Sequence, residues 1–145
     1  MRQYTVTDIG PLVPLIKKNI DMNLPGIASE KLLVEELDWI ALESASPSQR
    51  IKVYNTAERP VDLLLAVDCL YNPSLVPPFL ATINHLSTSE RTAVVIFSEL
   101  RAEDVMRDFL EQWLNIPGWE IWRIPNDQVG KRYVLWVGWK SVKPT

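Results

Sequence analysis

The chain has 145 residues, of which 47% are hydrophobic and 23% are charged, and its formal net charge is −3. A chain of this length has the size of one domain with its own buried core, and the composition excludes a disordered protein. Because charges of both signs are spread along the sequence, no clustered basic surface is expected and direct nucleic-acid binding is not predicted.

Cysteine and histidine occur once each, as Cys69 and His85. This excludes a disulfide within these residues and argues against a metal site made of His and Cys ligands. The default compartment is then a reducing one, the cytoplasm or the nucleus. The longest apolar runs, such as 63–67, are far shorter than the ~20 residues of a membrane-spanning helix, so no membrane partner is expected.

The first part of the sequence alternates between strand and helix patterns. Residues 3–8 alternate with β-branched side chains and predict a strand, whereas residues 12–22 carry apolar side chains at helical spacing. Residues 32–37 predict a second short strand. The stretch 43–49, rich in Ser with one Pro, predicts a loop, and 51–54 predicts either a brief strand or the edge of that loop.

The centre of the sequence predicts two strand–helix units. Residues 61–68 form an almost continuous apolar run, typical of a strand that is covered on both faces of a parallel sheet. Residues 75–86 predict a helix whose first turn accommodates two prolines. Residues 92–98 predict a second buried strand, and residues 102–114 an amphipathic helix.

Two further strands are predicted over 119–124 and 133–139, joined by a short polar turn that makes them antiparallel neighbours. Most tryptophans here fall at helix or strand spacing and are interpreted as packing residues. The whole order predicts an α/β fold with a mainly parallel sheet, helices on its faces and an antiparallel C-terminal strand pair. No glycine-rich strand-to-helix turn occurs anywhere in the sequence.

The most informative segment is Asp68-Cys-Leu-Tyr71, directly after the strand predicted over 61–68. Ligands of open α/β sheets gather at the carboxyl ends of strands. A carboxylate there could hold a substrate amine, and a tyrosine ring attracts an alkylammonium group through its π face. The alternative is structural: Asp68 caps the helix that begins near Pro73, and Tyr71 packs on that helix.

Other polar and aromatic residues also follow predicted strands. Asp8 could accept hydrogen bonds from ribose hydroxyls, or could simply form a turn before Gly10-Pro11. Trp39 could flank an adenine, although an isolated tryptophan after a strand is more often a core residue. Glu99 and Arg101 could line the same cleft as Asp68, but a local ion pair that caps the next helix is the favoured interpretation.

These residues resemble a known family. Asp68-Cys-Leu-Tyr71 after an apolar strand is similar to the Asp-x-x-Tyr motif of the seven-stranded (class I) S-adenosylmethionine-dependent protein-lysine methyltransferases, the methyltransferase-like group. The wider segment 63–75 is similar to the fungal branch that methylates ribosomal proteins. Val6-Thr-Asp8-Ile resembles the family's second strand, and Glu36-Leu-Asp-Trp39 its Leu-x-Trp-Gly element, with Ile40 in place of the glycine.

The resemblance implies a Rossmann-like sheet, S-adenosyl-L-methionine as cofactor and a protein substrate, with a ribosomal protein suggested by the fungal branch. Asp8 would bind the ribose, Trp39 and Val67 would flank the adenine, and Asp68 with Tyr71 would line the lysine channel.

The family's first strand and glycine-rich loop precede the element at Asp8, and this sequence starts after them. In the family that strand lies between the strands equivalent to 3–8 and 61–68. We therefore expect residues 1–145 to be a single partial, N-terminally truncated methyltransferase domain with a gap at that position. A second copy of the chain, a partner chain or a further N-terminal segment would supply the missing part. The alternative is a non-catalytic remnant that acts as a protein-interaction module. An unrelated nucleotide-binding α/β protein is a third interpretation, against which the missing phosphate loop argues.

Overall fold

The computed structural model describes residues 3–27 and 31–141, whose strands form two separate sheets. The smaller sheet pairs β1 (Tyr4–Asp8) with β2 (Leu32–Glu36) in parallel, with Asp8 opposite Glu36. A 3-10 turn, η1 (Gly10–Leu12), leads into α1 (Val13–Asn23) between the two strands. The two strands and the helix predicted for this region are confirmed.

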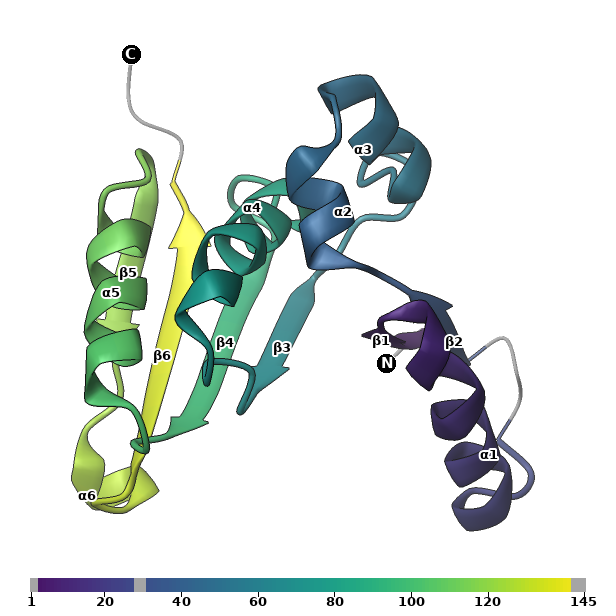
Figure 1. Cartoon of the computed structure of the whole chain (residues 1–145), viewed down its shortest axis with the longest axis horizontal. Helices are drawn as coiled ribbons and strands as arrows, with labels where there is room; N and C mark the ends of the chain where they lie inside the picture. Colours follow the sequence, from purple (N-terminus) through teal and green to yellow (C-terminus); the bar gives the residue numbers. More distant parts are fainter. Residues whose placement is uncertain (1–2, 28–30, 142–145) are drawn as a thin grey trace.

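The larger sheet has four strands in the order β3-β4-β6-β5 (Figure 1). They are β3 (Leu63–Val67), β4 (Ala93–Glu99), β6 (Tyr133–Lys140) and β5 (Trp119–Arg123). β3 and β4 are parallel, whereas β6 is antiparallel to both of its neighbours. The predicted antiparallel C-terminal pair is therefore confirmed, and the turn within it contains the short helix α6 (Asn126–Val129).

Two helices cover one face of the larger sheet and enclose the main core. They are α4 (Val76–Leu86), entered through the 3-10 turn η2 (Pro73–Leu75), and α5 (Glu103–Leu114). The amphipathic helix predicted over 102–114 is confirmed: Val105, Met106, Phe109 and Trp113 are buried on its inner side, and Leu110 is half-buried. Phe109 and Trp113 pack at a ring-centroid distance of 5.3 Å. Trp136 of β6 lies 5.9 Å from Phe109, so the central strands and α5 share one aromatic core.

The loop predicted over 43–49 and the strand considered for 51–54 are wrong. These residues belong largely to two short helices, α2 (Trp39–Ser44) and α3 (Pro47–Val53). The Ser and Pro that suggested a loop are helix-start residues: Ser46 and Gln49 form a capping box and Pro47 occupies the first helical position. Residues typical of turns and residues typical of helix N-termini are the same types, which explains the error.

β3 is not covered on both faces, contrary to the expectation from its apolar run. Ala66 is buried, but Leu63, Leu65 and Val67 are 53%, 46% and 63% exposed. Within the described residues β3 pairs only with β4, and no helix covers the face that carries these three side chains (Figure 1). An apolar run predicts a strand that can be buried, but burial also requires an element on each side.

The two sheets do not pair with each other within the described residues, so a gap separates β1 from β3 (Figure 1). Side chains that follow or face β2 connect the smaller sheet to the rest of the structure, among them Leu37, which clusters with Leu86 of α4. Trp39, at the start of α2, packs on Phe79 of α4 with ring centroids 5.0 Å apart. Arg59, in the connection between α3 and β3, donates to both carboxylate oxygens of Glu35 in β2 at 3.1 and 3.0 Å.

No helix in the described ranges is long and apolar enough to cross a membrane.

Candidate functional site

The candidate site lies where β3 and β4 end, and Asp68 is its best-positioned residue. Asp68 follows β3 directly and has a φ of 54°, in the left-handed region that non-glycine residues seldom adopt. Its backbone N–H donates to the Phe97 carbonyl at 2.7 Å, and its Oδ1 accepts from the backbone N–H of Glu99 at 3.4 Å. β4 therefore holds Asp68 in this conformation from both the backbone and the side chain.

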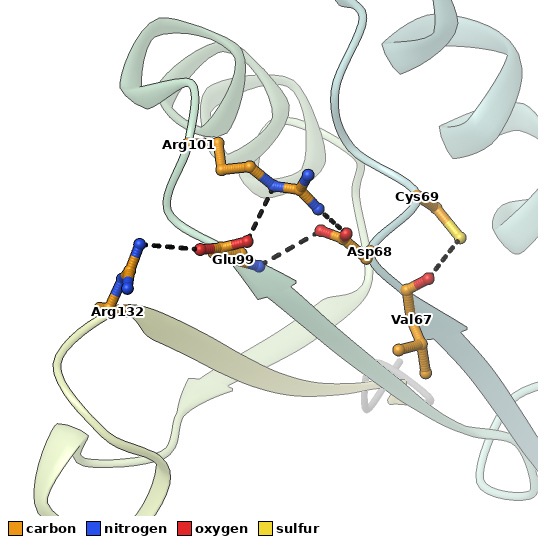
Figure 2. Close-up of polar contacts among 6 residues, drawn as sticks. All are labelled: Val67, Asp68, Cys69, Glu99, Arg101 and Arg132. Atoms are coloured by element: carbon orange, nitrogen blue, oxygen red, sulfur yellow. Dashed lines mark hydrogen bonds and ion pairs between the residues drawn. The ribbon is translucent and has the colours of Figure 1, made fainter.

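Charged side chains surround the Asp68 carboxylate (Figure 2). Arg101 donates through a terminal nitrogen to Asp68 Oδ2 and, through Nε, lies 3.0 Å from Glu99 Oε2. Arg132 lies 3.5 Å from the other carboxylate oxygen of Glu99. The predicted ion pair of Glu99 and Arg101 is confirmed, but no side chain caps α5. The alternative role of Asp68 as a cap is wrong, because Asn72 caps η2.

Tyr71 is not brought to Asp68. Its side chain is 69% exposed, and it makes no hydrogen bond or ring contact within the described residues.

Arg132 belongs to the charged cluster but was not identified from the sequence. The signal that could have found it is the antiparallel pairing of β4 with β6, which places Tyr133 opposite Glu99 and so brings the start of β6 to the end of β4.

Asp8 ends β1 at the corresponding edge of the smaller sheet. Its Oδ1 accepts from the backbone N–H of Ile9 at 2.8 Å, and its carbonyl accepts from Leu37 at 2.9 Å. Burial raises the pKa of the Cys69 thiol, and the negative charge of Asp8 raises it further. The ends of β1 and β3 thus lie within electrostatic range of each other.

Trp39 and Val67 occupy different environments. The Trp39 ring is half-buried against Phe79, so one side of it belongs to the core, as the structural alternative expected. Val67, the last residue of β3, exposes 63% of its surface beside the gap. Their expected contacts with an adenine stay a prediction. Among the described residues, no three His, Cys, Asp or Glu side chains group as metal ligands.

Comparison with known proteins is consistent with this arrangement. A family profile described as lysine methyltransferase matches residues 1–115. Mouse protein N-lysine methyltransferase METTL21A is 30% identical over 102 residues, which cover 70% of this chain and 41% of that protein. Ribosomal lysine N-methyltransferase 5 of Eremothecium gossypii is 23% identical over 130 residues, with 75% of this chain and 41% of that protein covered. The same-named protein of Zygosaccharomyces rouxii is 32% identical over 88 residues, with 57% and 27% covered.

A solved structure, the human methyltransferase 10 domain containing protein, shares the fold. Its TM-score is 0.51 at 10% identity, and the match covers 97% of this chain and 60% of that one. The alignment with mouse METTL21A spans about two fifths of that protein's length. Because the family profile spans most of the sequence, the chain belongs to the lysine methyltransferase family and has a mixed α/β fold resembling a methyltransferase domain.

Proposed function

We propose that this chain carries the substrate half of an S-adenosylmethionine-dependent protein-lysine N-methyltransferase, and that its substrate is a ribosomal protein in the cytoplasm or nucleus. Family membership supports the reaction class, and two fungal relatives named as ribosomal lysine methyltransferases support the substrate. The observation that carries the proposal is the Asp68 carboxylate, fixed by β4 at the end of β3.

The residues present fit the adenosine part of the cofactor. Asp8 uses Oδ1 for a local hydrogen bond, while Oδ2 makes none within the described residues and is available to a ribose hydroxyl. Val67 offers an exposed apolar side chain, and Trp39 a half-exposed ring, for the adenine. No part of the sequence resembles the glycine-rich turn that would hold the methionine part.

When bound, S-adenosylmethionine supplies a methyl group on a positively charged sulfur. The main role of this chain is then to position the lysine nitrogen and to favour its deprotonated form. Asp68 would hold the incoming ammonium by a charge-assisted hydrogen bond and fix its location. The ammonium would then give one proton to solvent water, and the neutral amine would stay in place through a remaining N–H that donates to the Asp68 carboxylate. Tyr71, exposed three residues later, would move its ring over the alkyl chain once the substrate is bound.

We propose further that residues 1–145 form one partial domain of a Rossmann-like sheet, and that a strand from a second copy, a partner chain or a preceding segment of the same chain completes it. β1 and β3 each have one edge that is unpaired within the described residues. A strand placed between them would satisfy the backbone groups of both edges, and a loop following that strand would reach the ends where Asp8 and Asp68 lie.

The second candidate function is a non-catalytic protein-interaction module derived from a methyltransferase. The observation that favours it is the exposure of Leu63, Leu65 and Val67 on the unpaired strand β3. Contiguous apolar side chains at a sheet edge recruit other strands, whether or not a cofactor is present. A chain with this role would bind a partner equally well with an altered Asp68.

Transfer of a radioactive methyl group from S-adenosylmethionine to ribosomal proteins tests the enzymatic proposal. The purified chain is incubated with ribosomal subunits, and Asp68→Asn is compared with Asp62→Asn. Asp62 immediately precedes β3 at its other end and pairs with Arg91 at 2.9 Å, so its loss leaves the site intact. Label on lysine with wild type and Asp62→Asn, and its loss with Asp68→Asn, is the expected result. No label with any of the three favours the interaction module.

A further inference from the structure

We propose that Arg101 is an internal competitor for the lysine-binding carboxylate, so that a substrate ammonium reaches Asp68 only by displacing it onto Glu99. This inference rests on the proposed function, because it concerns the regulation of the same site. Three features of the residues in Figure 2 support it. They are the hydrogen bonds that hold Asp68, the ion pair of Arg101 with Glu99, and the solvent exposure of the Arg101 and Asp68 side chains.

Asp68 does not depend on Arg101 for its position. Its backbone N–H is bonded to Phe97, its Oδ1 is bonded to the Glu99 amide, and both partners belong to β4. Arg101 contacts the remaining oxygen, Oδ2, which is the atom that an incoming cation would use. The guanidinium therefore occupies a cation-accepting position that exists without it.

Arg101 also has a second carboxylate within reach. Its Nε lies 3.0 Å from Glu99 Oε2, while its terminal nitrogen holds Asp68. A guanidinium presents several N–H donors in a fixed plane, so it can release one carboxylate and keep the other. Arg101 would thus lose only part of its charge pairing when a lysine takes its place at Asp68.

The exchange is also sterically simple. The Arg101 side chain is 61% exposed and the Asp68 side chain 41% exposed, so neither must leave a packed core. Glu99, with 26% exposure, is held in addition by Arg132 and gives the displaced guanidinium a fixed acceptor. Since exposed ion pairs are weak, Arg101 should reduce ammonium binding by about two- to five-fold, enough to select against weakly held amines and too little to block a docked protein.

Titration with n-butylammonium, which reproduces the lysine side chain, tests this inference on the whole chain. The reporter is the backbone amide of Glu99 in ¹⁵N NMR spectra, because that N–H donates to Asp68. Arg101→Gln should bind the probe about two- to five-fold more tightly than wild type, and Arg101→Lys, which keeps a cation, should stay near wild type. The matched control Arg91→Gln removes an exposed arginine that pairs with Asp62, beyond the other end of β3, and should change nothing.

The outcomes separate this inference from the proposed function. Unchanged or weaker binding to Arg101→Gln, with binding still lost in Arg101→Gln/Asp68→Asn, overturns the competitor role and leaves Asp68 as the lysine site. Equal binding before and after Asp68→Asn removes Asp68 from the proposed function. If neither wild type nor Arg101→Gln shifts the Glu99 amide, both the inference and the proposed site are contradicted.

Discussion

Replacing Gly138 by alanine should destabilise the core on which the site is built. A Cβ at this position of β6 would lie 2.6 Å from Cζ2 and 2.9 Å from Cη2 of Trp113. Trp113 is fully buried and packs against Phe109 and Trp119, with centroids 5.3 and 5.4 Å away, so its ring cannot retreat alone. Overpacking of a well-filled core costs about 1–3 kcal/mol, and such short contacts with a confined ring place Gly138→Ala at about 2–3 kcal/mol.

Urea unfolding followed by tryptophan fluorescence measures this cost, and the melting temperature should fall by about 6–10 °C for a chain of this length. Gly10→Ala is the matched control. Its Cβ would meet the Glu36 carboxylate at 2.8 Å, but Glu36 is an exposed side chain whose end can turn away. The control should therefore change stability by less than about 0.5 kcal/mol.

The double variant with Trp113→Phe tests the mechanism, because phenylalanine lacks the two atoms that clash. Gly138→Ala should cost clearly less in the Trp113→Phe background than in the wild type, since contacting residues are not additive. The reasoning is refuted if Gly138→Ala melts at the same temperature as the wild type, or if the destabilisations of the two single variants simply add in the double variant.

Three further predictions concern the N-terminal cap of α3 and the ionisation of Lys140 and Cys69. Ser46→Ala should lower stability by about 0.5–2 kcal/mol in urea unfolding, because it removes the capping box of α3, and an unchanged midpoint would contradict this. Burial lowers the pKa of Lys140 in the folded chain below its ordinary value of about 10.4. At pH values between the folded and the ordinary pKa, the unfolded chain holds more protons than the folded one, so rising pH increases the free energy of unfolding. Lys140→Met should remove this rise, measured as unfolding free energy against pH. Because burial and the charge of Asp8 raise the pKa of Cys69, its alkylation should be slow at pH 8 and faster in Asp8→Asn. Equal alkylation rates in the two proteins would show that Asp8, at the end of β1, does not act on Cys69, after the end of β3.

The elements whose burial is decided by local pattern were predictable. The apolar stripe of α5 specifies which side of the helix faces the core, and the structure agrees with it. The pattern failed at β3, where an apolar run indicates a strand but carries no information about what covers it. It failed again at Ser46, because helix caps and loops use the same residue types.

The candidate site was predictable only in part. Asp68 could be found because an acid directly after a buried strand lies at the edge where ligands gather. Its pairing with Arg101, 33 residues later, depends on β3 and β4 being parallel neighbours, and the approach of Arg132 depends on the antiparallel order of β6. These contacts are set by sheet topology, which a single sequence specifies weakly.

The central claim, that Asp8, Trp39 and Val67 form a binding surface for the adenosine part of the cofactor, is tested most directly by a thermal melt with and without S-adenosylhomocysteine. Binding to the folded state alone adds RT ln(1 + [L]/Kd), about 2.7 kcal/mol at a ligand concentration of 100 Kd. The account predicts a cooperative melt that shifts upward with ligand and shifts less in Asp8→Asn. A cooperative melt that the ligand does not move would contradict the claim and leave the interaction module as the function of this chain.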